Sequence, residues 1–174
     1  MQRYSSRKRN RLTNWNYSEP SDYFITICSF ERQNIFGDIK NDEMFFSEIG
    51  KIVNQCWLDI PKHFRVNEID SWVIMPNHIH GILTIQQDLF VVGNNHGCSL
   101  PVKRNHEMIP KVISMFKSSV TRIVRKNLDV DFPIWQKSYY DHIIRSERSL
   151  EKIRQYIENN VYTWEKDTEN IDIK

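Results

Sequence analysis

The stretch from Ser71 to Ile85 constrains the fold more than any other part of the sequence, because it predicts two strands joined by a tight reversal. The residues on either side of Pro76-Asn77 are apolar and rich in β-branched and aromatic side chains, whereas Pro76-Asn77 itself is typical of a turn. Side chains on a strand alternate between the faces of the sheet, so we expect His78 and His80 to point the same way.

Two imidazoles side by side offer an edge for a divalent cation, because neutral imidazole nitrogen is a good ligand. In an arbitrary sequence a His-x-His pair is more often a polar surface stripe, but its place beside a turn between apolar strands favours a site. A histidine triad would need a third histidine where Ile82 stands. A zinc finger would need paired cysteines, whereas Cys28, Cys56 and Cys98 are far apart.

Because neutral imidazole is the form that binds metal, an ordinary histidine pair predicts that metal-dependent activity fades as the pH falls through about 6.5.

The length of 174 residues suits one domain, and we expect residues 1–174 to form it. No apolar run approaches the length of a membrane span, and the basic start of the chain does not resemble a secretory signal. We therefore expect a cytoplasmic protein without membrane contact. Its three cysteines predict reduced thiols and no disulfide framework.

The formal net charge is only +2, but the positive charge is concentrated in an N-terminal arm, residues 1–20. Such an arm is typical either of contact with a polyanion or of a solvated terminus. The arm residues that we single out as candidate DNA contacts are Arg7, Lys8, Arg9 and Arg11.

The first half of the chain alternates predicted strands with one helix. Residues 23–30 predict a buried strand, and residues 36–46 predict a short hairpin. Ser47 is a plausible N-cap for a helix whose apolar residues recur at helical spacing as far as Phe64. Pro61 is expected to disturb its last turn.

Residues 86–105 are rich in glycine, asparagine and proline, and predict a flexible loop. A second helix is expected from Pro110 onward, with an apolar stripe and a basic remainder. That basic surface could bind phosphates or could be an ordinary solvated face. Its candidate DNA contacts are Lys117, Arg122, Arg125 and Lys126.

Residues 132–145 are aromatic and alternating, which predicts a further strand or extended segment. Tyr140 and His142 within it are candidate DNA contacts. Ser146 is then placed to cap a last helix.

On that last helix, Tyr156 and Asn160 are four residues apart and therefore share one side, about one turn apart. Taken alone, Tyr156 would be an ordinary tyrosine at the edge of the core. Lys152, one turn earlier, could lower the pKa of that tyrosine, but a solvent-exposed lysine is the preferred interpretation. Beyond Asn160 the tail is polar, and we expect no contribution to the core.

Three motifs in this order resemble those of the HUH single-strand transposases, in particular the REP-associated tyrosine transposases and their relatives. They are residues 75–81 (MPNHIHG), Trp135-Gln136 with the later residues 140–142 (YDH), and residues 154–160 (RQYIENN). The resemblance covers nearly the whole chain. One departure is visible, because relatives often carry proline directly after the asparagine, where this chain has Val161.

The resemblance implies an α+β fold, a ferredoxin-like HUH domain with a central antiparallel sheet and packed helices. It implies that His78, His80 and Asn160 bind a divalent metal, Mg²⁺ or Mn²⁺, and that Tyr156 is the nucleophile. The implied activity is cleavage and rejoining of single-stranded DNA at hairpin-associated sites through a 5′-phosphotyrosine intermediate. Relatives include monomers and domain-swapped dimers, so a homodimer is possible.

Two alternatives remain open. A domesticated protein that binds DNA hairpins without cutting would keep the fold, although the intact histidines and Tyr156 argue against it. A replication or conjugation initiator nickase would use the same chemistry but usually has additional domains. Tyr139 and Tyr140 also compete with Tyr156 as nucleophiles, since they lie late in the chain near a histidine.

Overall fold

The computed structural model describes residues 21–64, 68–85 and 108–167. The elements in chain order are β1 (Ser21–Cys28), η1 (Phe30–Arg32), β2 (Gly37–Lys40), β3 (Glu43–Phe46), α1 (Glu48–Leu58), α2 (Ile60–His63), β4 (Glu68–Ile74), β5 (His78–Ile85), α3 (Met108–Leu128), β6 (Tyr140–Ile144), α4 (Glu147–Asn159) and η3 (Val161–Lys166). None of the described helices is both long and apolar enough to cross a membrane.

A four-stranded sheet in the order β4-β5-β1-β6 forms the centre of the fold, and every neighbouring pair is antiparallel. The sequence β1, α1, β4, β5, α3, β6 with this strand order is the ferredoxin-like arrangement. The predicted α+β fold is therefore confirmed. Residues 72–85 form the expected pair of strands around the Pro76-Asn77 turn, as β4 and β5.

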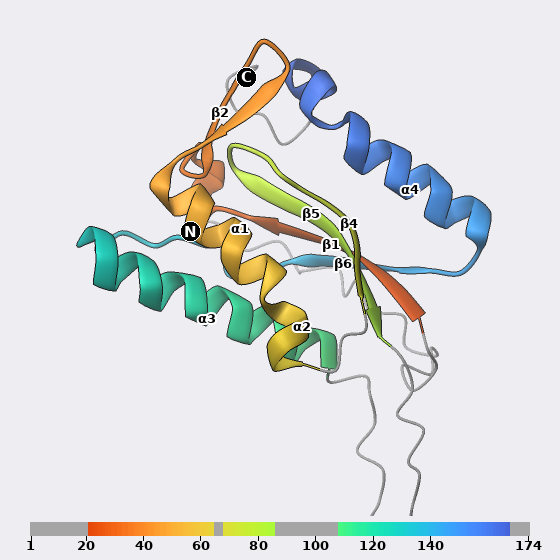
Figure 1. Ribbon diagram of the computed structural model, residues 1–174, viewed down its shortest axis with the longest axis horizontal. Helices are drawn as coiled ribbons and strands as arrows, with labels where there is room; N and C mark the ends of the chain where they lie inside the picture. The colour runs from red at the N-terminus through yellow and green to blue at the C-terminus, as the bar shows by residue number, and fades with distance from the viewer. Residues whose placement is uncertain (1–20, 65–67, 86–107, 168–174) are drawn as a thin grey trace, which may run out of the picture.

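Helices α1, α2 and α3 cover one face of the sheet, and α4 lies on the other (Figure 1). The larger core lies on the α1–α3 side, where Trp57 meets Phe116 edge to face at 5.3 Å. Gly81 of β5 faces this side, and a Cβ there would lie 2.3 Å from Cζ2 of Trp57. The absence of a side chain at Gly81 lets α1 approach the sheet closely.

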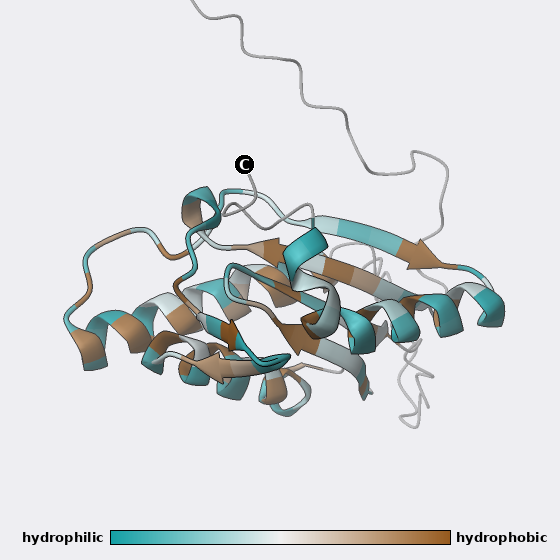
Figure 2. Ribbon diagram, turned by 90° about the horizontal axis from the view of Figure 1, so that it is seen from above, coloured by the Kyte–Doolittle hydropathy of each residue, from teal (hydrophilic) through white to brown (hydrophobic). Residues whose placement is uncertain are grey.

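The opposite face of the sheet packs against α4 through a smaller apolar cluster of Ile82, Ile144, Leu150 and Ile157. Figure 2 shows the helices banded with hydrophilic and hydrophobic turns, as expected for helices that cover a sheet with one side only. An ion pair adds to this packing, because Arg154 Nε lies 2.9 Å and Nη2 2.8 Å from Oδ2 of Asp70 on β4. Helix α4 is therefore fixed over the β4 and β5 side of the sheet.

Local sequence signals account for most element boundaries. Ser47 Oγ accepts a hydrogen bond from the Gly50 amide at 3.0 Å, and Ser146 Oγ accepts one from the Ser149 amide at 3.2 Å. Both predicted N-caps are confirmed. The hairpin predicted between residues 36 and 46 is also confirmed, as β2 and β3 joined by Asn41 and Asp42 with positive φ values of 52° and 58°.

Two expectations are corrected. The helix predicted from Ser47 to Phe64 is two helices that meet at Asp59, with Pro61 in the first turn of α2. Proline lacks the amide proton that would continue the α1 hydrogen-bond ladder, which accounts for the break.

The tail after Asn160 does contribute to packing, because it forms η3 and its Trp164 is only 8% exposed. The predicted arm (1–20) and the predicted loop (86–105) lie outside the described residues.

Candidate functional site

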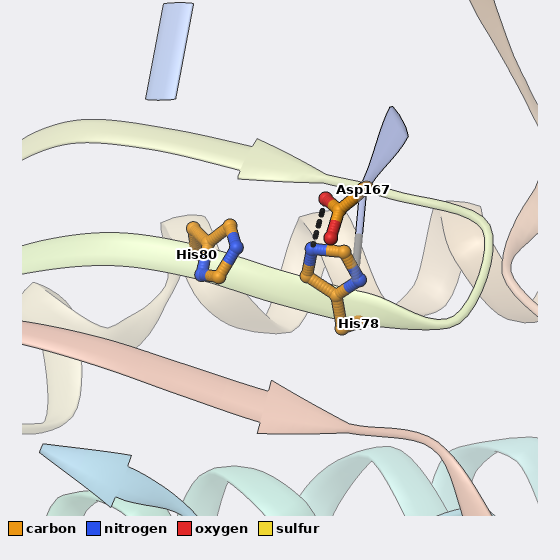
Figure 3. A group of neighbouring side chains, drawn as sticks. All are labelled: His78, His80 and Asp167. Atoms are coloured by element: carbon orange, nitrogen blue, oxygen red, sulfur yellow. Dashed lines mark ion pairs between the residues drawn. The ribbon is translucent and has the colours of Figure 1, made fainter. Parts of the chain in front are cut away.

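Two buried histidines on the α4 side of β5 form the centre of the candidate site. His78 is 0% and His80 is 3% exposed, and their ring centroids lie 4.4 Å apart. Figure 3 shows both rings standing on the same face of the strand. The alternation predicted from the sequence is confirmed.

The first imidazole, His78, has its tautomer fixed by its neighbour. Asn77 Nδ2 donates to the backbone carbonyl of Arg32 at 3.0 Å, which leaves Asn77 Oδ1 to face His78 Nδ1 at 2.8 Å. Because an amide oxygen only accepts, Nδ1 of His78 carries the proton and Nε2 has the free lone pair. That buried Nε2 has no hydrogen-bond partner among the described residues.

The second imidazole, His80, contacts two hydroxyl groups. Its Nδ1 lies 2.9 Å from Thr26 Oγ1 on β1, and its Nε2 lies 3.1 Å from the Tyr156 hydroxyl on α4. Phe24 stacks on the His80 ring at 5.2 Å and meets the Tyr156 ring edge-on at 6.1 Å. The structure therefore brings the predicted nucleophile directly to the predicted metal ligand.

A carboxylate that the sequence analysis missed joins the histidines. Asp167, at the end of η3, places Oδ2 3.8 Å from Nε2 of His78, and its side chain is 6% exposed (Figure 3). One potential ligand atom from each of His78, His80 and Asp167 lies within 4.8 Å of the others. The one sequence signal for this contact was Trp164, whose apolar ring packs 6.0 Å from the His78 ring and anchors η3 there.

Asn160, the third predicted ligand, is the C-cap residue of α4 and is 1% exposed. Neither its Oδ1 nor its Nδ2 has a hydrogen-bond partner among the described residues. A buried carboxamide without partners is costly, and coordination or substrate contact would compensate that cost. Its position one turn after Tyr156 is consistent with such a role, which stays a prediction.

Burial determines the charge state of the two imidazoles. It lowers the pKa of His80 to about 3. The pKa of His78 is held well below its usual range by burial first, and then by His80 and Arg32. Both rings are neutral at physiological pH, which is the form that binds metal. The folded, metal-free pair therefore does not titrate near pH 6.5, and the fading of metal-dependent activity at that pH stays a prediction.

The donor set fits a divalent cation, since two neutral imidazole nitrogens converge with a carboxylate oxygen in a buried position. Nε2 of His78, which belongs to this set, has no hydrogen-bond partner among the described residues, and the buried amide of Asn160 is one further polar group that an ion or a phosphate could satisfy. The group His78, His80 and Asp167 can therefore bind a metal ion.

The predicted DNA contacts fall on both faces of the sheet. Tyr140 and His142 pair with Thr26 and Phe24 across β1 and β6, so they share the α4 face with His80. The basic residues of α3 lie on the other face, where Lys117, Ser118, Thr121, Arg122 and Arg125 line an open pocket of about 540 Å³. Lys126 is exposed on the last turn of the same helix.

Lys117 differs from the other α3 cations, because its ammonium group already has acceptors. Its Nζ donates to the carbonyl oxygens of Gln136 at 2.7 Å and Ser138 at 3.3 Å. Trp135 Nε1 in turn donates to the Lys117 carbonyl at 3.2 Å. Lys117 therefore ties α3 to the segment that leads into β6, and its predicted phosphate contact stays a prediction.

A relative and a solved structure are similar to this chain over most of its length. The chain is 40% identical over 170 residues to an uncharacterized protein of Haemophilus influenzae, covering 95% of this chain and 94% of that one. The structure of this chain resembles that of a REP-associated tyrosine transposase bound to a REP hairpin, with a TM-score of 0.53 and 15% identity. The match covers 94% of this chain and 74% of the transposase chain. At that identity the likeness establishes the fold alone, which this chain shares with that transposase. No protein-family model matches the sequence.

Proposed function

We propose that this chain, which belongs to the same family as the uncharacterized Haemophilus influenzae protein, is a metal-dependent endonuclease and transposase that cuts and rejoins single-stranded DNA through a 5′-phosphotyrosine on Tyr156. One observation carries the proposal: the Tyr156 hydroxyl lies 3.1 Å from Nε2 of His80. A hydroxyl beside a pair of imidazoles that can bind a metal is an arrangement that supports phosphoryl transfer to tyrosine.

The proposed metal is Mn²⁺ or Mg²⁺, held by His78 and His80 with oxygen from Asp167 or Asn160. Two imidazole nitrogens suit Mn²⁺ better than Mg²⁺, which prefers oxygen ligands and retains its waters. When bound, the ion would polarise the scissile phosphate and offset the charge that develops in the transition state.

The proposed chemistry begins with attack of the Tyr156 oxygen on phosphorus. The bond from phosphorus to the 3′ oxygen breaks, and the DNA that follows the cut stays attached to the tyrosine by its 5′ phosphate. The hydroxyl loses one proton and the departing 3′ oxygen gains one, so the reaction is balanced without an added reactant. A 3′-hydroxyl that attacks the phosphotyrosine reverses the step and joins the strands.

The exposure of Tyr156 is consistent with a macromolecular substrate. Its side chain is 46% exposed, although its hydroxyl touches the buried His80. The competing Tyr140 pairs with Thr26, which itself pairs with His80. Tyr140 is therefore two strands from the metal-binding ring, about 10 Å at the usual strand spacing. This difference favours Tyr156 as the nucleophile.

A DNA hairpin is the proposed recognition element. The similar solved structure holds a REP hairpin. The open basic pocket on α3 offers cations that could contact a phosphate backbone.

The test is incubation with end-labelled single-stranded hairpin pools and Mn²⁺, followed by a denaturing gel. We expect a covalent adduct that carries the 3′ label, no adduct in EDTA, and no adduct with Tyr156→Phe. Tyr140→Phe should retain the adduct. An adduct that persists in Tyr156→Phe would overturn the nucleophile. Hairpin binding without any adduct would instead identify a non-cutting hairpin-binding protein.

A further inference from the structure

The side of α4 that bears Tyr156 differs in charge from the side that faces β4. Arg154 is bound to Asp70 of β4 and is surrounded by Glu147 at 3.7 Å and Glu151 at 3.9 Å. This β4-facing side therefore carries more acidic than basic groups and would repel a nucleic-acid backbone.

The other side of α4 is basic and leads to the nucleophile. Arg148, Lys152 and Tyr156 are spaced four residues apart, so they form a row along the helix about 12 Å long. Both cations are exposed. Tyr156 at the end of the row contacts Phe24 of β1, so this end of the row lies beside β1, which pairs with the edge strand β6.

That part of the sheet carries aromatic rings on the same face. Tyr140 pairs with Thr26 and His142 pairs with Phe24, and Tyr140 is 44% exposed. His80, Thr26 and Tyr140 form one cross-strand row of about 10 Å, which about three stacked nucleotides would span at roughly 3.4 Å each.

From this arrangement we infer that single-stranded DNA crosses the β6 edge on the α4 face, with its bases on Tyr140 and His142 and its phosphates along Lys152 and Arg148. Aromatic rings beside a line of cations are how proteins hold single strands without sequence preference, because every base can stack and every nucleotide carries a phosphate. The path would deliver a phosphate to Tyr156. It rests on the proposed function, and it assigns the substrate channel of the same site.

The path is continuous with the basic pocket on the other face. Lys117 binds the carbonyl groups of Gln136 and Ser138, only a few residues before Tyr140. The pocket on α3 therefore lies beside the segment that enters the edge strand. A DNA hairpin on α3 could send its single-stranded flank around this edge to Tyr156 without passing the acidic side of α4.

The experiment measures binding separately from cutting. Every variant is made in a Tyr156→Phe background, and the probe is a fluorescently labelled, mixed-sequence 12-nucleotide single strand. We expect Tyr140→Ala to weaken binding about 5- to 100-fold, the range for loss of one base stack. Arg148→Gln and Lys152→Gln should each reduce the slope of log affinity against log salt by about 0.7.

Two matched controls complete the design. Glu158→Gln alters an exposed charge elsewhere on α4, and Lys51→Gln removes an exposed cation on α1 across the sheet. Neither should weaken binding. If the background protein binds the strand and the path variants bind equally well with unchanged salt slopes, the path is wrong while the proposed function stands. If the background protein binds no single strand at all, the proposed function fails together with the path.

Discussion

The Tyr156 hydroxyl and a metal ion would bind the same atom, Nε2 of His80. The hydroxyl lies 3.1 Å from this nitrogen, and the other ring nitrogen is 2.9 Å from Thr26 Oγ1. Since Thr26 contacts Nδ1, Nε2 is the ring nitrogen that faces the site, and it offers a lone pair to a metal in the tautomer whose Nδ1–H donates to Thr26 Oγ1. A metal bound to this lone pair would displace the hydrogen bond, and in the proposed function the hydroxyl would then be available to the substrate.

Removal of the hydroxyl should therefore strengthen metal binding. We expect Tyr156→Phe to bind Mn²⁺ about 2- to 10-fold more tightly in calorimetry, because one net hydrogen bond no longer competes. Tyr162→Phe, altered at a residue that is 67% exposed, is the control and should bind as the unaltered protein does. Weaker binding by Tyr156→Phe would mean that the hydroxyl supports the metal instead of competing with it.

Thr26 should fix the tautomer of His80 that can bind metal. Thr26→Val keeps the shape of the side chain but removes the hydroxyl that lies 2.9 Å from Nδ1, and we expect Mn²⁺ affinity to fall about 10- to 100-fold. Thr26→Ser retains an oxygen and should restore most of the affinity. Equal affinities for the two variants would show that the hydroxyl has no part in orienting the ring.

Acid should destabilise the metal-free protein through the buried histidines. Burial lowers the pKa of His80 to about 3, so between about pH 6.5 and 3 the unfolded chain takes up a proton that the folded chain does not. The contribution of neutral His80 to the free energy of unfolding is fully present above this window. Within the window it decreases as the pH falls, by at most about 1.4 kcal/mol per pH unit. Urea unfolding in EDTA should show a shallower pH dependence for His80→Gln. Identical pH profiles for the unaltered protein and His80→Gln would contradict a lowered pKa of His80 in the folded protein.

The Arg154 ion pair should hold α4 in place. Asp70→Asn weakens the charge-assisted bonds at 2.8 and 2.9 Å, so amide exchange in α4 should accelerate roughly 10-fold, more than exchange in β1 and β5. Lys51→Gln, which breaks an exposed pair with Glu48, should change nothing measurable. If amide exchange accelerates equally in α4, β1 and β5, the ion pair contributes to global stability and does not specifically hold α4 on the sheet.

Local patterns predicted the placement of several side chains at the site, whereas the roles of Tyr156 and Asn160 came from the resemblance. Strand alternation put His78 and His80 on one face, and the N-cap at Ser146 fixed where α4 begins and therefore which side Tyr156 occupies. These signals work because they depend on neighbours a few residues away.

Contacts between distant segments were not visible in the sequence. Asp167 lies in a polar tail and reaches His78 because Trp164 packs beside that ring. Lys117 resembles any surface lysine until its two carbonyl acceptors are seen. The pKa of His80 likewise depends on burial by α4, which spacing along β5 cannot reveal.

Gly81 links the chemistry on one side of β5 to the packing on the other. A methyl group at this position would lie 2.3 Å from Cζ2 of Trp57, so the strand would have to move away from α1. His80 is the adjacent residue and would move with it. Among natural variants of this protein, residues 57 and 81 should therefore change together. A lineage that acquires a side chain at position 81 must first replace Trp57 by a smaller residue, because the reverse order would displace His80 from the site.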